Sequence, residues 1–464
     1  YGDWSSKVLA EASENRKEKS TMKRNWVAKV VALSLCIPMI MGGNVLTVNA
    51  DSGEKLKISF ASTWDPAAGG SQEAQYNNWF LKVKEQYETK YPDREVEYSA
   101  YAWETIDAKL MSDEEAGIER GITLINNSQL ATHYAANSLT SLQPLWDDLS
   151  EEEKADISWF NLDAYKNNGE IYAIPATVHT RVFAYRKDLF EAAGLDPEKP
   201  PKTLDELVEY AKILTTDDVY GLGIYLGNEE GTCEVSYNPL IWYFGGDTWN
   251  SETKEATFAS EAGIKAAQFL SDCVNTWKIT PEFSLSGRRE DVVEKPFING
   301  QYAIATGWGP YWFEDMQNAG MISGVTPPSE DYDLGNIGFF NIEGIDWYTN
   351  AWALGIAENC TYKEEAMDFI RMAMEMENIE NYTEGLPVLE SIYEEPQYKE
   401  STVYQEYKNS IANGRWAVPT KNYKNLTLSI SAAIQEVIMT NDADKTAEIM
   451  QRYQDEYNAQ YAGE

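Results

Sequence analysis

The sequence is poor in the residues that build metal centres, disulfide frameworks and nucleic-acid surfaces. Only two histidines occur in 464 residues, which excludes a histidine-rich metal centre, and we expect neither a metal site nor a cofactor. Four cysteines are too few for a disulfide framework. Basic residues number 38 against 75 acidic ones, a formal net charge of −37. Because phosphate binding depends on lysine and arginine, we exclude a nucleic-acid-binding protein.

Long apolar runs are also scarce, and the run that could be a membrane span or a signal peptide lies in the first fifty residues. A basic start at residues 22–29 precedes an apolar stretch over residues 30–41, which is too short to span a membrane. Ala50 ends a small-residue cleavage motif. Residues 22–50 therefore predict a secretory signal peptide, and residues 1–21 an upstream segment that is not part of the native protein. We expect the protein to act outside the cytoplasm, secreted, periplasmic or at the cell surface.

The cysteines give little support for covalent attachment or cross-linking. Cys36 lies inside the leader and follows Leu35, where a lipoprotein signal has a small residue, so we do not expect a lipid anchor. Cleavage near residue 50 leaves Cys233, Cys273 and Cys360. This odd, sparse set allows at most one bridge, and the sequence does not distinguish which pair would form it.

The first part of the mature chain alternates strand and helix patterns. Alternating apolar residues predict strands at 56–60 and 95–98, and a short apolar run predicts a third at 122–125. Helical spacing is found over 73–90 and 104–111. This strand–helix–strand–helix–strand order predicts a parallel sheet with helices on its faces.

The rest of the chain continues as a mixture of strands and helices. A helix is expected over 204–214, with Thr203 as its N-cap. Glu206, three residues after Thr203, has the spacing of a capping box. A second helix is expected over 261–274, and mostly helical sequence follows residue 356. Further strands are expected at 169–175, 181–185, 220–226, 303–306 and 352–356. We therefore expect an α/β protein.

Five segments, in order along the chain, resemble motifs of one protein family. The segment 185–195 resembles its Tyr-Asn-Lys-Asp-Leu-Phe…Ala-Gly-Leu, 201–207 its Pro-Lys-Thr-Trp-Asp-Glu-Leu, and 169–175 its Gly-x-Tyr-Ala-Ile-Pro. The segments 297–311 and 363–370 resemble its Phe-x-x-Gly-x-Tyr-Ala-Met…Gly-Pro-Trp and Lys-Glu-Ala-x-x-Phe-Ile. The family is the extracellular solute-binding proteins of family 1, carbohydrate-binding partners of bacterial ABC importers that are related to maltose-binding protein.

The resemblance implies a two-lobed periplasmic-binding-protein-like fold of the class II type, with the ligand in the cleft between the lobes. It implies a monomer that captures a carbohydrate, most simply an oligosaccharide, closes its lobes and delivers the ligand to a membrane permease. Carried onto this sequence, the chain crosses between lobes near residues 178–181, 306–309 and 349–352. The N-terminal lobe then comprises 51–178 plus 308–350, and the C-terminal lobe 179–307 plus 351–464.

Candidate ligand residues follow from sugar chemistry and from these expected crossings. Tryptophan and tyrosine cover the apolar C–H faces of a sugar, and polar side chains bind its hydroxyl groups. Most candidates are residues of these types that follow strands or lie near the crossings. Trp242 lies instead in a segment that resembles the family's aromatic-x-x-Gly-Gly, and Arg415 lies in a late loop. The candidates are Trp64, Asp65, Trp103, Asn127, Ser128, His179, Arg181, Trp242, Trp308, Tyr311, Trp312, Trp347 and Arg415. The aromatic cluster of Trp308, Tyr311 and Trp312 is the strongest prediction among them.

Each candidate also has a structural alternative. The tryptophans can pack in the core or fill the hinge, and Ser128 can cap the helix that it precedes. His179 occupies a position where the resemblance implies a sugar-facing carboxylate, but it can equally be a hydrogen-bonded hinge residue. Arg181 and Arg415 can form salt bridges instead of contacting ligand.

Two other functions remain open from the sequence. The same fold can bind a peptide, a polyamine or a sugar phosphate, although the aromatic cluster favours a sugar. A secreted glycosidase needs two carboxylates flanking a cleft, and so many acidic residues make pairing uninformative. No nucleophile elbow, Walker loop or zinc-protease motif occurs. The acidic segments 331–333 and 441–444 lack the full spacing of a calcium loop.

Overall fold

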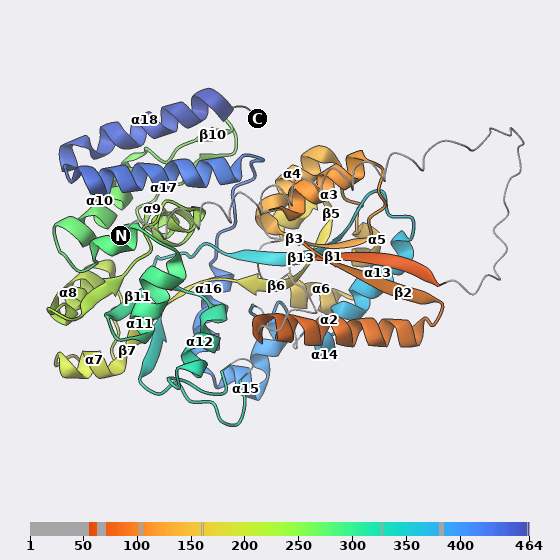
Figure 1. The fold of residues 1–464 in the computed structure, drawn as a ribbon, viewed down its shortest axis with the longest axis horizontal. Coiled ribbons are helices and arrows are strands. Elements are labelled where there is room, and N and C mark those ends of the chain that lie inside the picture. Colours follow the sequence, from red (N-terminus) through yellow and green to blue (C-terminus); the bar gives the residue numbers. More distant parts are fainter. Residues whose placement is uncertain are drawn as a thin grey trace, which may run out of the picture. The chain divides into compact units, whose positions relative to one another are not determined.

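The computed structural model describes residues 55–62, 71–101, 105–158, 160, 162–325, 328–379, 385–461 and 463 (Figure 1). The expected signal peptide, the segment before it and Cys36 lie outside these residues, as do three candidate ligand residues: Trp64, Asp65 and Trp103. Within the described ranges, no helix combines the length and the apolar composition needed to cross a bilayer.

The described chain forms two main sheets, two short hairpins and the helices that cover them. The first sheet has the spatial order β2 (Arg94–Ala100), β1 (Leu56–Ser62), β3 (Ile122–Asn126), β13 (Asn350–Ile356), β6 (Ala173–His179). The second sheet has the order β12 (Ile337–Phe340), β7 (Val182–Arg186), β11 (Tyr302–Trp308), β8 (Tyr220–Gly223). The hairpins are β4 (Lys166–Asn167) with β5 (Glu170–Ile171), and β9 (Trp249–Asn250) with β10 (Glu255–Ala256).

The helices in chain order are α2 (Ser71–Lys90), α3 (Ile106–Glu115), α4 (Leu130–Ala136), α5 (Gln143–Asp148), α6 (Glu151–Ile157), α7 (Lys187–Ala192), α8 (Leu204–Leu214), α9 (Asn238–Tyr243), α10 (Glu261–Asn275), α11 (Lys295–Ile298), α12 (Phe313–Asn318), α13 (Lys363–Ala373), α14 (Met376–Ile379), α15 (Pro396–Lys399), α16 (Thr402–Ala412), α17 (Tyr423–Thr440) and α18 (Ala443–Tyr461). Short 3₁₀ or π segments are η1 (Asn127–Gln129), η2 (Asp163–Tyr165), η3 (Thr232–Tyr237), η4 (Glu282–Leu285), η5 (Glu290–Glu294), η6 (Pro310–Trp312) and η7 (Glu390–Glu394).

Helices cover both faces of the first sheet, as its buried strands require. The rings of Phe60 in β1 and Phe80 in α2 are 4.8 Å apart, and Phe60 lies 5.8 Å from Phe369 in α13. The next residue, Ala61, faces the other way and clusters with Ile106 of α3. The alternation of one strand therefore assigns α2 and α13 to one face and α3 to the other. The strands β1, β2 and β3 run parallel, which confirms the predicted order.

The second sheet is covered by helices from the middle and the end of the chain. The helix α8 packs against β8, and α10, α17 and α18 pack on one another (Figure 1). The Thr203 hydroxyl accepts a hydrogen bond from the Glu206 amide at 3.1 Å, so the predicted N-cap of α8 is confirmed. Cys233, Cys273 and Cys360 are free and buried, so the one bridge that the sequence allowed does not form.

Two strands lie in a different sheet from the one that the predicted lobe boundaries imply. The strand β12, inside the range 308–350 predicted for the first lobe, pairs with β7 of the second sheet. The strand β13, almost all of which lies in the range 351–464 predicted for the second lobe, is inserted between β3 and β6 of the first. The helices α13 and α14 follow it and pack on α2. The physical reason is ladder pairing, since β13 satisfies hydrogen-bonding groups on both of its edges there.

The connections between the sheets meet at one place. The chain passes from β6 to β7 through Thr180 and Arg181, and from the second sheet into β13 through Thr349. The hydroxyl oxygens of Thr180 and Thr349 are 3.0 Å apart. Trp308, at the end of β11, lies opposite Val182 of β7. These contacts bring together the end of β6, the start of β7, the end of β11 and the start of β13.

A glycine inside α10 shows how closely the second lobe is packed. Alanine at an exposed helix position is favoured over glycine by about 1 kcal/mol. A Cβ atom at Gly263 would lie 1.9 Å from the Phe258 carbonyl oxygen and 2.5 Å from the Tyr237 hydroxyl. Gly263→Ala is therefore expected to lower the free energy of unfolding by about 1–3 kcal/mol, measured by denaturant titration. Lys265→Ala, at an exposed position of the same helix, is the control, and a stabilising Gly263→Ala would contradict the packing.

Candidate functional site

A polar cavity of about 570 Å³ lies between elements of the two sheets. Arg181, on the segment from β6 to β7, lines it. From the first sheet and η1 come Asn126, Ser128, His179, Asn350 and Trp352. From elements around the second sheet come Glu229, Glu230, Gly231, Glu234, Arg288, Tyr311, Tyr348, Lys424 and Leu428. Because strand ends of open α/β sheets commonly form ligand clefts, this cavity is the candidate site.

Asn126 fixes the wall that follows β3. Its side-chain oxygen accepts hydrogen bonds from the Ser128 amide at 3.1 Å and the Ser128 hydroxyl at 2.9 Å. The backbone amide of Asn126 donates to the Gln129 side-chain oxygen at 3.1 Å, which completes a capping box. The turn therefore holds two polar side chains, Asn126 and Ser128, at the carboxyl end of a buried strand.

The crossing from β6 to β7 brings a histidine and an arginine to the cavity. His179 ends β6, and its ring centroid lies 6.3 Å from that of Tyr311. The Arg181 guanidinium lies over the Tyr311 ring at 5.4 Å and donates to the Thr180 carbonyl oxygen at 2.9 Å. Arg181 is only 6% exposed. An aromatic face, an imidazole and a buried cation thus share one end of the cavity.

Glu234 of η3 is the main titratable group of the opposite wall. Its carboxylate accepts a hydrogen bond from the Tyr423 hydroxyl at 3.0 Å. Burial, reinforced by the neighbouring Glu230, raises the pKa of Glu234 to about 7, while Arg181 and the hydroxyl of Tyr348 act in the other direction. The carboxyl group is therefore partly protonated near neutral pH, and can donate as well as accept a hydrogen bond.

The remaining carboxylates of that wall have partners of their own. The Lys424 ammonium lies 3.6 Å from the Glu230 carboxylate. Burial raises the pKa of Glu230, and Lys424 opposes that shift. Glu229 lies near the hydroxyl of Tyr225, and burial together with Glu229 raises the pKa of that hydroxyl. The acidic wall is thus largely compensated from within the protein.

A second charged cluster lies outside the cavity lining, near the connections between the two sheets. It contains Arg289, Glu294 and Asp315, with the ring of Trp312. The Arg289 guanidinium stacks on Trp312 at 4.3 Å and donates to the carbonyl oxygen of Gly307. Burial lowers the pKa of Arg289. Burial also raises the pKa of Glu294 to about 9, with the neighbouring carboxyl of Asp315 as the next cause. Glu294 of η5 is therefore protonated at neutral pH, close to Asp315 of α12.

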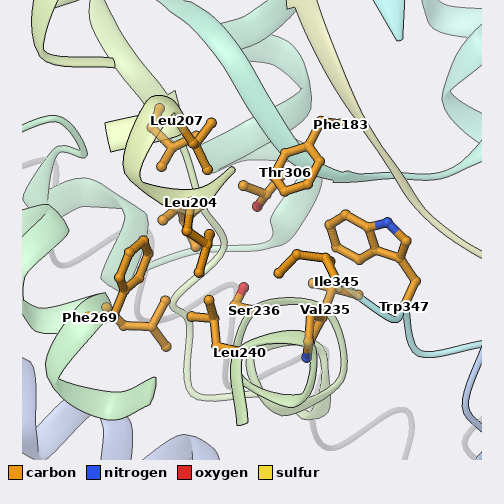
Figure 2. Close-up of a pocket in the computed structure, with 14 residues that line it drawn as sticks. Phe183, Leu204, Leu207, Val235, Ser236, Leu240, Phe269, Thr306, Ile345 and Trp347 are labelled. Atoms are coloured by element: carbon orange, nitrogen blue, oxygen red, sulfur yellow. The ribbon is translucent and has the colours of Figure 1, made fainter. Parts of the chain in front are cut away.

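A small apolar void of about 30 Å³ lies inside the second lobe (Figure 2). Trp347 and Phe183 point toward it from one side, and Leu204 and Leu240 from the other (Figure 2). The Trp347 indole donates to the Asn341 side chain at 2.8 Å. So small a space with almost no polar lining is a packing void rather than a ligand site.

Four of the thirteen predicted ligand residues line the polar cavity: Ser128, His179, Arg181 and Tyr311. Six others, in the described chain, do not: Asn127, Trp242, Trp308, Trp312, Trp347 and Arg415. Within the predicted aromatic cluster, only Tyr311 reaches the cavity, because Trp308 and Trp312 are 0% and 2% exposed. Their indole rings pack together with centroids 4.6 Å apart. In this structure both tryptophans pack where the connections between the two sheets meet, which is the structural alternative given for them above.

The other predicted residues are held by contacts within the protein. The Asn127 side-chain oxygen accepts from the Ala351 amide at 2.9 Å, which ties η1 to β13. The Arg415 side chain donates to Asp346 at 2.9 Å and lies over the Trp242 ring at 5.2 Å. Arg415 thus has the salt bridge that the sequence left open as an alternative.

The sequence missed several residues of the cavity. Tyr348 directly precedes the predicted crossing at 349–352 and Asn350 and Trp352 lie within it, whereas the sequence predicts only Trp347 there. The crossing itself was the available signal. Glu234 and Lys424 are remote from one another in sequence and follow no motif, so no local pattern could have found them.

The described residues offer no obvious place for a bound metal ion. No three histidine, cysteine, aspartate or glutamate side chains gather there in an arrangement that could hold one. The carboxylates of the cavity face hydroxyl and ammonium groups instead. The site's chemistry is that of hydrogen bonding, aromatic contact and charge.

Comparison with known sequences gives one clear family match. The family described as bacterial extracellular solute-binding protein matches residues 70–379. A binding protein of Brucella abortus is 25% identical over 272 residues, which are 58% of this chain and 60% of that protein. The sn-glycerol-3-phosphate-binding periplasmic protein of Pectobacterium atrosepticum is 26% identical, over 51% of this chain and 52% of that protein. The chain thus matches a little over half the length of these curated relatives.

Solved structures share the fold over nearly their whole length. An ABC transporter solute-binding protein of Thermotoga lettingae, bound with alpha-D-tagatose, has a TM-score of 0.68 at 19% identity, covering 88% of this chain and 99% of that one. The sugar-binding protein MalE of Xanthomonas citri has a TM-score of 0.69 at 18% identity, covering 86% and 96%. These likenesses confirm the predicted two-lobed α/β fold. The family and these structures are described as binding proteins rather than enzymes.

Proposed function

Because the chain belongs to the bacterial extracellular solute-binding protein family, we propose that it captures a carbohydrate outside the cytoplasm for an ABC importer. The ligand, an oligosaccharide, binds between the lobes, and closure of the lobes presents the complex to the permease. Closure follows from a higher affinity of the ligand for the closed form than for the open one. The protein acts as a monomer after cleavage near Ala50 and changes no covalent bond of its ligand.

The polar cavity is the observation that carries this proposal. It combines aromatic side chains, Tyr311 and Trp352, with hydrogen-bonding groups such as Asn126 and Asn350. Aromatic faces suit the C–H surfaces of a sugar, and amides can donate to and accept from its hydroxyl groups. The solved structure bound with alpha-D-tagatose, and the relative named for sn-glycerol 3-phosphate, support a polyhydroxylated ligand.

The test is a ligand screen on the mature chain. Thermal unfolding of residues 51–464 is measured with mono- and oligosaccharides, peptides and polyamines, and calorimetry follows for each stabilising compound. We expect a carbohydrate to stabilise the fold and to be recovered unchanged. A product formed from the bound sugar would indicate a glycosidase, and stabilisation only by peptides or polyamines would overturn the ligand class.

Removal of the cavity's aromatic faces is expected to weaken ligand binding. Tyr311→Ala and Trp352→Ala should each raise the dissociation constant of the identified sugar at least about tenfold, since buried aromatic residues dominate binding energies. Calorimetry measures the effect. Tyr243→Ala is the matched control, because Tyr243 is 36% exposed and does not line the cavity. Unchanged affinity in both cavity variants would place the sugar elsewhere.

A further inference from the structure

Arg181 is a buried charge that faces the cavity, and no carboxylate among the residues that the structure describes pairs with it. Its side chain is 94% buried by surface area, being only 6% exposed, yet it lines the cavity. Within the described part of the chain, its guanidinium donates one hydrogen bond, to the neighbouring Thr180 carbonyl oxygen, and its Nε has no partner there. A buried cation is costly unless an anion or several strong acceptors surround it.

The carboxylates of the cavity do not fill this role. The Glu230 carboxylate lies 3.6 Å from the Lys424 ammonium, and Glu229 lies near the Tyr225 hydroxyl. The charge of Arg181 opposes the rise that burial causes in the pKa of Glu234, but the hydrogen bond that the Glu234 carboxylate accepts comes from the Tyr423 hydroxyl. No salt bridge joins any of them to Arg181 in the described part of the chain.

A second positive charge near Arg181 makes its burial more costly without an anion. Arg289 lies close enough on the hinge side for the two positive charges to repel, and its guanidinium is stacked on Trp312. Arg415 provides the contrast, because Asp346 neutralises it at 2.9 Å. Arg181 in the cavity lining and Arg289 behind it therefore lie near each other, and no carboxylate of the described residues bridges them.

The groups beside Arg181 suit the rest of a carbohydrate. The Tyr311 ring offers an aromatic face, and the guanidinium already lies over it at 5.4 Å. The side-chain oxygen of Asn350 is buried and has no hydrogen-bond donor among the described residues. A sugar hydroxyl is such a donor. The cavity thus offers an anion-binding group, an aromatic face and a hydroxyl acceptor together.

We propose that the ligand is an acidic carbohydrate, whose carboxylate or phosphate group binds the guanidinium of Arg181. This inference rests on the proposed function, since it specifies the class of carbohydrate that the same cavity binds. Arginine matches both planar carboxylates and phosphates by paired hydrogen bonds, so the two anions share one chemistry. Arg181 is then the residue that distinguishes acidic from neutral sugars.

The experiment compares acidic sugars with their neutral parents on the mature chain. The probes are galacturonate and its oligomers, glucuronate, glucose 6-phosphate and glycerol 3-phosphate, against galactose and its oligomers, glucose and glycerol. Thermal unfolding selects the binders and calorimetry measures their affinities. We expect an acidic probe to bind at least about thirtyfold more tightly than its neutral parent. The carboxylate and phosphate arms show which anion is preferred.

Three variants assign the effect to Arg181. Arg181→Gln should weaken the acidic probe at least about thirtyfold and its neutral parent less than about threefold, because only a charged contact is lost. Arg181→Lys keeps the charge and should lose less than Arg181→Gln. Arg452→Gln is the control, because Arg452 also stacks on a tyrosine ring but lies on α18, outside the cavity. Melting temperatures check that each variant is folded.

The outcomes separate this inference from the proposed function. Tight binding of neutral sugars, with acidic ones weaker, would overturn the inference and leave the carbohydrate transport function intact. Binding of an acidic sugar that is unchanged in both Arg181 variants would also overturn it. An anion that is not a carbohydrate, such as an acidic peptide, binding through Arg181 would instead overturn the proposed ligand class. Stabilisation by no probe in the panel would overturn the inference as stated.

Discussion

Trp308→Ala is expected to lower the free energy of unfolding by about 3–5 kcal/mol, the cost of removing a fully buried tryptophan. The side chain is 0% exposed. Its ring lies 4.8 Å from that of Phe297 and 4.6 Å from that of Trp312, at the end of β11 where the two sheets meet. The cavity left by alanine cannot collapse easily, since these neighbours are themselves fixed by packing. Denaturant titration measures the loss as a shift in midpoint at constant slope.

A second substitution tests whether volume is the cause. The Trp308 indole nitrogen is buried without a hydrogen-bond partner among the described residues. Trp308→Phe removes that nitrogen and keeps much of the ring, so it should cost clearly less than Trp308→Ala. Trp277→Ala, at a partly exposed position, serves as the control. A stable Trp308→Ala variant with reduced sugar affinity would show instead that Trp308 faces the ligand.

The tryptophans at the hinge illustrate what the sequence could and could not predict. The crossings near residues 178–181 and 349–352 were located from motifs, because those motifs fix where strands begin and end. Which side chains face the cavity depends on strand register. The register shifts between Ala305 and Trp308 in β11, and between Trp352 and Ala353 in β13. Such irregularities change the facing of a side chain locally, so alternation in the sequence could not distinguish Trp308 from Trp352.

Pairing between distant segments set a second limit. The parallel strands β1, β2 and β3 and the N-cap at Thr203 follow from local patterns, and the structure confirms them. The place of β13 does not follow from local patterns, because its partners β3 and β6 lie more than 170 residues earlier in the chain. The acidic wall arises in the same way, since Glu234 meets Tyr423 from a distant helix. Tertiary contacts therefore decided both the lobe membership and the charge of the site.

Buried carboxyl groups are expected to make the protein less stable as the pH rises. A carboxyl whose pKa is higher in the folded than in the unfolded state holds its proton in the folded state alone across that interval. Its contribution to stability is therefore fully present below the unfolded pKa and is lost as the pH rises to the folded pKa. Glu234 acts between pH 4.5 and about 7, and Glu294 between pH 4.5 and about 9. Denaturant titrations from pH 5 to 9 measure the combined decline.

Glutamine variants assign this decline to the two residues. Glu294→Gln keeps a neutral group that can hydrogen bond to Asp315, so it should remove the decline between about pH 7 and 9 and cost little at pH 6. The neighbouring charges, Arg289 and Glu290, are unchanged in this variant. Glu234→Gln should reduce the slope only below about pH 7, where Glu294 still contributes. An exposed carboxyl, Glu191, gives the control substitution. A decline above pH 7 that persists in Glu294→Gln would show that Glu294 is already ionised in the folded protein.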